Sequence, residues 1–115
     1  MRISNLDVVL KDMEGKEIKT VEIQNNQRQT VPMTLRKQIL EVLRTDKIMA
    51  DDRRSVVTVN DKSEEEKFTD FKLGMRISDA KQGLELKSDD VVRIKKLAHY
   101  LDTENLGALY QHIDK

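Results

Sequence analysis

The chain has 115 residues and no cysteine, and its 21 basic and 21 acidic residues give a formal net charge of +0. The absence of cysteine excludes disulfides and thiolate chemistry, and the balanced charge excludes the long-range positive field by which non-specific nucleic-acid binders attract phosphates. No stretch approaches the roughly 20 apolar residues needed to span a bilayer, so we expect an untargeted protein of the cytoplasm without membrane contact.

The length and composition predict one domain with a thin core. A chain of this length buries about two thirds of the surface that it exposes when unfolded, so folding needs no disulfide or metal. Only 37% of the residues are hydrophobic and 3% are aromatic, while 37% are charged, which predicts an aliphatic core. Because such a core is marginal in stability, we expect a homodimer or a complex with a protein partner that buries a shared face.

Residues 1–30 are expected to form a β-hairpin. A strand over residues 8–10 precedes a turn over residues 12–16, in which Gly15 supplies the positive φ of a tight turn. The second strand is predicted over residues 18–23, where apolar and polar residues alternate almost regularly. Residues 24–29 are all polar and predict a solvated loop or, alternatively, a polar contact surface.

A first helix is predicted within residues 31–45. Pro32 suits its first turn, since the missing N–H would be unpaired there, and Thr30 is the expected N-cap. Apolar residues then recur at helical spacing, at Leu35, Ile39, Val42 and Leu43. The helix is expected to end near Arg44 or Thr45.

Residues 46–62 form a variable connector for which two structures are open. The strand propensity from Ser55 to Val59 predicts either a third short strand or an ordered loop. A charged turn precedes this stretch and is a possible contact site for a partner, formed by Asp51, Asp52, Arg53 and Arg54. We expect mobility or partner-dependent order to be concentrated in this connector.

Residues 63–115 are predicted to be helical, which gives an α+β fold with the hairpin packed on about four helices. Ser63 and Glu66 have the spacing of a capping box that begins the second helix. That helix carries two overlapping apolar rows, and we expect both to be buried: Phe68, Phe71 and Met75 in one, and Leu73, Ile77 and Ala80 in the other. Gly83 is the expected terminator.

Two further helices are expected after residue 83. Ser88 is predicted to cap the third helix, whose buried stripe is formed by Val91, Ile94, Ala98 and Leu101. After a break at residues 102–103, Thr103 is predicted to cap the last helix, whose inward face is formed by Leu106, Leu109, Tyr110 and Ile113.

The residue types that usually carry catalysis or bind metals are poorly placed for either. His99 and His112 are the only histidines, and neither has a Glu or a second His at the spacing of a helical zinc site. The acidic residues within 61–66 lack the central glycine and the alternating ligands of an EF-hand. The serines have no neighbouring base, and the glycines form no phosphate-binding pattern. We therefore expect no metal, no cofactor and no enzymatic activity.

A basic cluster on the third helix leaves a second function open. Its members are possible contacts for nucleic acid or for a protein partner, and they are Arg93, Lys95, Lys96 and His99. With the break at residues 102–103, the last two helices could imitate a helix-turn-helix, which would make the chain a DNA-binding regulator. Solvation and the negative end of the helix dipole also explain the lysines.

Six short segments follow one another in a characteristic order over most of the chain: Glu14-Gly15-Lys16-Glu17-Ile18, Leu35, Ser63-Glu64-Glu65-Glu66-Lys67, Met75-Arg76-Ile77, Leu86-Lys87-Ser88 and Ile94-Lys95-Lys96-Leu97. In this order of parts, which does not include residues 55–59, the chain resembles short proteins encoded by bacteriophages and prophages. The resemblance implies a phage origin, action in the host cytoplasm, and a host or phage protein as partner. The leading hypothesis is thus a non-catalytic protein-interaction module, acting as an inhibitor or as an assembly factor.

Overall fold

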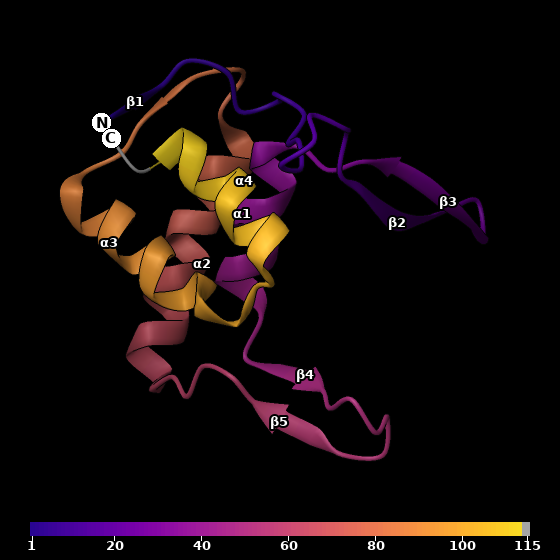
Figure 1. The fold of residues 1–115 in the computed structure, drawn as a ribbon. Coiled ribbons are helices and arrows are strands. Elements are labelled where there is room, and N and C mark those ends of the chain that lie inside the picture. The colour runs from indigo at the N-terminus through magenta and orange to yellow at the C-terminus, as the bar shows by residue number, and fades with distance from the viewer. Residues whose placement is uncertain (114–115) are drawn as a thin grey trace.

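Residues 1–113 are described by a computed structural model in which helices and short strands alternate along the chain (Figure 1). Over these residues the helices are α1 (Leu35–Arg44), α2 (Glu64–Asp79), α3 (Ser88–Leu97) and α4 (Thr103–Ile113), with a 3-10 turn, η1, at Ala98–Tyr100. The strands are β1 (Arg2–Ile3), β2 (Lys19–Gln24), β3 (Gln27–Pro32), β4 (Lys47–Met49), β5 (Val56–Thr58) and β6 (Leu84–Glu85). The predicted α+β fold with about four helices is confirmed.

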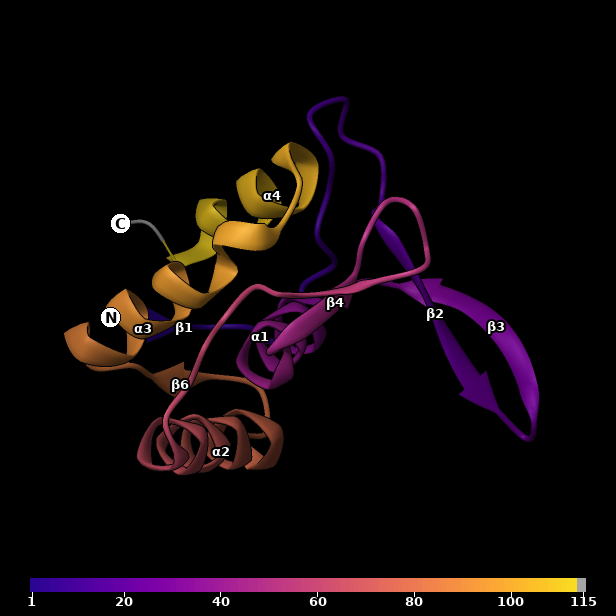
Figure 2. The same cartoon turned by 90° about the horizontal axis from the view of Figure 1, so that it is seen from below.

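The helices enclose an aliphatic core. Figure 2 shows α2 and α4 on opposite sides of the helical part, and α1 lies between them in contact with α2, α3 and α4. Within residues 1–113 the buried apolar side chains belong to Leu, Ile, Val, Ala and Met, so the expected aliphatic core is confirmed. No helix in this part of the chain has the length and apolar character required to cross a bilayer.

The strands form three separate antiparallel pairs, β1 with β6, β2 with β3, and β4 with β5. The β1–β6 pair joins the start of the chain to the segment after α2, with Arg2 opposite Glu85 and Ile3 opposite Leu84. Figure 1 shows that the other two pairs project from the helices as hairpins. These two hairpins are the least covered parts of the fold.

The N-terminal hairpin is displaced from its predicted position. The turn at Gly15 forms as expected, with a φ of 81° and with Gly15 N donating to Asp12 O at 3.0 Å. However, the strand predicted over residues 8–10 is wrong, because only Val9 forms a bridge there. The regular hairpin is β2–β3, and the predicted loop over residues 24–29 is also wrong. Asn25 and Asn26 adopt φ values of 51° and 62°, and Asn tolerates this left-handed region well enough to form a two-residue hairpin turn.

The first helix ends at Arg44, as predicted, but starts later than predicted. Thr34 is its N-cap and accepts a hydrogen bond from Lys37 N at 3.2 Å, so the predicted cap at Thr30 is wrong. Pro32 lies at the end of β3 opposite Lys19 and not in the first turn of the helix. Pairing with β2 keeps residues 27–32 extended, which overrides the helix-start signal of the proline.

The connector forms a hairpin, and of the two structures left open for residues 55–59 the strand is the one that forms, as β5. The strand that pairs with it, β4, lies in the first half of the connector and is not indicated by the sequence pattern. The charged residues 51–54 form the tip, where Arg53 has a φ of 57° and the Asp52 carboxylate accepts from Arg54 N at 2.9 Å.

The helical region starts as predicted and differs at three later helix ends. The capping box of Ser63 and Glu66 is confirmed, with Glu66 N donating to Ser63 Oγ at 3.1 Å. However, α2 ends at Asp79, and Gly83 is not its terminator. A Cβ at Gly83 would lie 3.0 Å from Ile3 O, so the glycine permits the close approach of β6 to β1.

The predicted caps at Ser88 and Thr103 are wrong by one position. Both residues already belong to their helices, α3 and α4. The Asp90 carboxylate accepts from Lys87 N at 3.0 Å, and the Asp102 carboxylate accepts from Asn105 N at 2.9 Å. At α4 the aspartate takes the place expected for the Thr103 hydroxyl, whereas at α3 the Asp90 carboxylate reaches back to the N–H of the residue before the helix.

Candidate interaction surfaces

The β2–β3 hairpin, residues 19–32, is here called the first arm. Its strands pair only with each other among residues 1–113, over six residue pairs. One face is open: its apolar side chains, Val21 and Ile23, are 51% and 76% exposed and lie opposite Thr30 and Arg28. On the other face the carboxylate of Glu22 contacts Lys37 Nζ on α1 at 2.8 Å, and the hydrogen bond from Lys37 lowers the pKa of Glu22. The first arm is therefore tied to α1 on one face and uncovered on the other.

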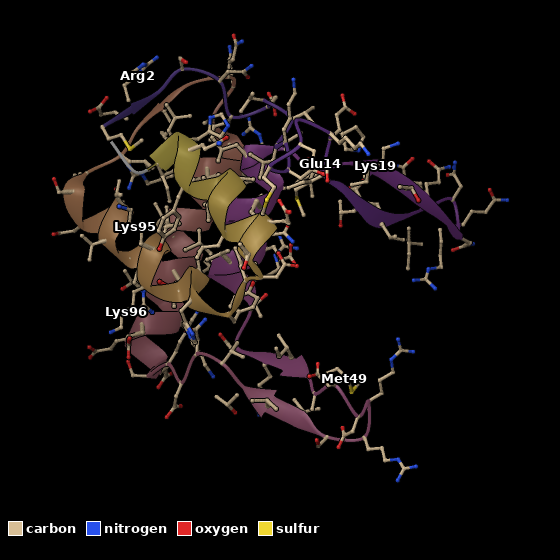
Figure 3. All side chains as sticks on the ribbon, viewed as in Figure 1. Arg2, Glu14, Lys19, Met49, Lys95 and Lys96 are labelled. Atoms are coloured by element: carbon tan, nitrogen blue, oxygen red, sulfur yellow. The ribbon has the colours of Figure 1, made fainter. Side chains whose placement is uncertain are left out.

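The β4–β5 hairpin, residues 47–58, is here called the second arm. Ile48 lies opposite Val57 and Met49 opposite Val56, so each face carries one apolar pair. All four of these side chains are exposed, by 36–61%, and Figure 3 shows Met49 on the arm well away from the helices. The predicted contact residues 51–54 form the tip of this arm and are exposed. There the backbone N–H of Arg54 lowers the pKa of Asp52.

His99 fastens the base of the second arm to η1. Its Nε2 lies 2.6 Å from Val59 O and 3.1 Å from Asn60 Oδ1, and both partners are acceptors, so Nε2 carries the proton. The buried Asn60 amide in turn donates to Leu97 O at 3.0 Å and to Thr45 O at 3.3 Å. His99, which the sequence suggested as a binding contact, thus holds η1 and the base of the second arm together.

The other members of the predicted basic cluster do not form one open surface. Arg93 is bound to Asp70 and to Glu66, and the hydrogen bonds to Asp70 raise the pKa of the guanidinium further above its ordinary value. Lys95 Nζ lies 5.3 Å from the centre of the Tyr110 ring. Lys96 is exposed, and Figure 3 shows it with Lys95 at the edge of α3.

A buried ionic cluster, formed by Lys62, Asp70 and Arg93, was not predicted from the sequence. Asp70 is 2% exposed and accepts from Arg93 Nε at 2.8 Å and Arg93 Nη2 at 2.7 Å. Lys62 Nζ lies 2.9 Å from Asp70 Oδ2, 2.7 Å from Leu43 O and 3.3 Å from Asp46 Oδ1. Burial alone would raise the pKa of Asp70, but the hydrogen bonds from Arg93 and Lys62 outweigh it and lower the pKa.

The ionic cluster accounts for acidic residues that superficially suggest a cation site. Glu66 caps α2 and contacts Arg93 Nη1 at 3.1 Å, while Asp70 binds Lys62 and Arg93. Among residues 1–113, no group of three or more His, Asp and Glu side chains converges in the way metal ligands do. The one sequence signal for this cluster is the spacing of Asp70, which shares a helical face with the buried Leu73 and Ile77.

The row Phe68, Phe71 and Met75, here called the outer row of α2, is not buried, so that prediction is wrong. These side chains are 61%, 63% and 49% exposed, whereas Leu73 and Ile77 on the other row are buried. The other helices lie on one side of α2 only, with α1 as its main contact. The apolar row on the opposite side therefore remains open. Between α1 and α2 lies a groove of about 510 Å³. Its lining combines apolar residues with polar and charged ones: Leu40, Leu43, Phe71, Gly74 and Met75, and Arg44, Asp46, Lys62, Lys67, Asp70 and Ser78.

Comparison of the chain with protein-family models, curated proteins and solved structures gives no match. The two arms and the outer row of α2 carry most of the exposed large hydrophobic side chains of residues 1–113.

Proposed function

We propose that this chain is a non-catalytic protein-interaction module that binds its partner with the two arms. The observation that supports this most strongly is the concentration of exposed apolar side chains on two hairpins that project from the helices (Figure 1). An isolated two-stranded hairpin is only marginally stable in water, and a row of unpaired strand groups is a template for another strand. Binding of a partner strand would remove both liabilities.

The arms suit β-strand addition. In that mode the backbone edge supplies hydrogen bonds, and alternate side chains select the partner. The open face of the first arm presents Val21 and Ile23, and the second arm presents an apolar pair on each face. The partner is expected to offer an extended segment with apolar side chains at every second position.

The resemblance to short phage-encoded proteins makes a host or phage protein the expected partner. By occupying a strand edge of such a protein, the chain would act in one of two ways. It would block that protein's other interactions, as an inhibitor does, or it would hold that protein for incorporation into an assembly, as an assembly factor does. Both roles require binding without chemistry, and both place the chain in the host cytoplasm.

The test is affinity capture from infected and uninfected cells with the full chain and arm variants. The arm variants are Ile23→Lys on the first arm and Val56→Lys on the second. The matched control is Val92→Lys, because Val92 is a comparably exposed apolar residue on α3, at 64%. We expect a partner that binds the parent chain and the control, and that is lost from at least one arm variant. Equal capture by all variants would refute the role of the arms.

A salt-dependent shift of duplex DNA would instead support the DNA-binding alternative. That assay uses the parent chain and a Lys96→Ala variant, because Lys96 is the exposed lysine of the basic cluster. We expect no shift at low salt with either protein.

A further inference from the structure

The groove between α1 and α2 has the size of a site for a small molecule. Its volume of about 510 Å³ falls within the range of about 300–1,000 Å³ that ligand sites usually have. The lining stripe of α2 runs from Lys67 to Ser78, a span of about 16 Å along the helix axis. No residue of the two arms is among those that line the groove, so it is separate from the surfaces proposed for partner binding.

The middle of the groove is apolar and has a floor that no side chain fills. Gly74 lies beside the leucines of α1, since a Cβ there would lie 3.8 Å from Leu40 Cδ2 and 3.9 Å from Leu43 Cδ1. Phe71 and Met75 of the outer row also line the groove, and both are exposed. A hydrocarbon chain or ring laid on this floor would remove apolar surface from water on both sides of the contact.

The cations of the groove gather at the end near the base of the second arm. Lys62 Nζ lies 2.7 Å from Leu43 O and 2.9 Å from Asp70 Oδ2, so it joins the end of α1 to the first half of α2. Arg44 is the last residue of α1, and Lys67 lies one turn before Asp70 on α2. The groove is therefore charged at this end and mainly apolar beyond it.

Two of these cations have no ionic partner in the chain. Among residues 1–113 Arg44 and Lys67 form no ion pair, whereas Lys62 contacts two carboxylates. The charged lining comprises three cations and two carboxylates, and its net charge is therefore +1: Arg44, Lys62 and Lys67, and Asp46 and Asp70. One carboxylate on a ligand would complement this charge.

From the volume, the apolar floor and the unpaired cations we infer that the groove binds a small amphipathic monocarboxylate. The guanidinium of Arg44 can hold the carboxylate through two N–H groups, and Lys67 adds a point charge beside it. The tail lies on the floor above Gly74 and reaches Met75, which is about 12 Å from Lys67 along the helix axis. A straight tail such as that of decanoate suits this length. The bound tail covers Phe71 and Met75, two of the three exposed side chains of the outer row.

The test is an NMR titration of the isotope-labelled full chain with decanoate. A dissociation constant on the order of 100 µM is expected for a ligand of this size, so a titration to about 2 mM approaches saturation. We expect saturable shifts of the backbone amides of Leu40, Leu43, Gly74 and Met75. Acetate has the head group alone, and decylammonium has the same tail with the opposite charge. Each should bind about tenfold more weakly than decanoate, or weaker still.

Substitutions test the two ends of the groove separately. Gly74→Leu fills the floor and should weaken decanoate binding by about tenfold or more, while it improves helix propensity. Arg44→Gln and Lys67→Gln should each weaken binding by about threefold to fivefold, and the double variant by about tenfold. Lys96→Gln is the matched control, because Lys96 is an exposed lysine of α3 that does not line the groove. It should bind decanoate as the parent chain does.

Absence of saturable shifts, equal binding of decylammonium, or undiminished binding by Gly74→Leu would overturn the inference. Shifts of the same amides that depend on protein concentration without decanoate would mean that a second copy of the chain fills the groove, and would overturn it as well. The arm variants Ile23→Lys and Val56→Lys should bind decanoate normally. Loss of partner capture and loss of decanoate binding are therefore distinguishable.

Discussion

Arg93 on α3 binds Asp70 on α2 through two nitrogens, with Nε 2.8 Å from Oδ1 and Nη2 2.7 Å from Oδ2. The carboxylate is almost completely buried, and Lys62 supplies a second cation at 2.9 Å. This planar, charge-assisted pair joins α2 to α3, two helices that are separated in the sequence by β6.

Removal of the Asp70 charge should destabilise the fold strongly. In Asp70→Asn, the buried ammonium of Lys62 and the guanidinium of Arg93 lose their shared buried carboxylate and keep only the more exposed Asp46 and Glu66 as partners. Breaking one side of a buried ion pair costs about 3 kcal/mol or more. Urea unfolding at pH 7 measures the change, and Asp89→Asn, an exposed aspartate on α3, is the control and should be nearly neutral. A loss below about 0.5 kcal/mol in Asp70→Asn would contradict this assignment.

Stability should depend on pH through the same carboxylate. The pKa of Asp70 is lowered in the folded state, so its stabilising effect is complete above the unfolded pKa of about 3.9. The effect is lost as the pH falls through the lower folded pKa, because the unfolded chain takes up the proton first. Glu66 acts in the same direction, since hydrogen bonds from Ser63 lower its pKa. Unfolding free energies measured from pH 7 down to about 2.5 should fall less steeply in Asp70→Asn than in the parent chain, whereas parallel curves would exclude this linkage.

Two glycine substitutions should change stability in opposite directions. Gly83→Ala places a Cβ 3.0 Å from Ile3 O and 2.9 Å from Arg2 Nη2, so β6 must move away from β1. A cost of about 2 kcal/mol is expected. Gly107→Ala lies on an exposed side of α4, meets no atom within 4 Å, and should stabilise by about 0.5–1 kcal/mol. Thermal unfolding of the two variants provides the comparison. A change of the melting temperature in the same direction in both variants would contradict the prediction.

The turn of the first arm should depend on the left-handed backbone of Asn25 and Asn26. Asn26→Ala should cost about 1 kcal/mol in the local stability of the arm, because alanine resists a φ of 62°. Asn26→Gly should keep or improve it. Hydrogen exchange of the β2 and β3 amides reports the local stability, with the α4 amides as an internal reference. Equal exchange in Asn26→Ala and Asn26→Gly would argue against the turn.

Local signals predicted the helices well and their surroundings poorly. The capping box at Ser63 and the stripe from Leu35 to Leu43 involve contacts within one helix, so the spacing of a few residues is sufficient to identify them. The two rows of α2 have the same helical period, and only the position of neighbouring helices determines which is buried. The outer row was therefore assigned to the core wrongly.

One strand of each arm, β3 and β4, and the ionic cluster were missed for a related reason. Strands exposed on both sides have little alternation to reveal them, and three-residue β4 has no strong pattern. The burial of Asp70 could be suspected from its position on the face of Leu73 and Ile77. Its partner Arg93 is separated from it by 23 residues, and no local rule identifies that pairing.

The base of the second arm converges on one residue. Asp46 O accepts from Val59 N at 2.9 Å and from Asn60 N at 3.1 Å, and its carboxylate contacts Lys62 in the ionic cluster. The second arm is consequently attached to the helical part in a fixed orientation. A partner held at its tip would have a defined direction relative to the helices, and a pull on that partner would be transmitted through Asp46 to the interior of the protein.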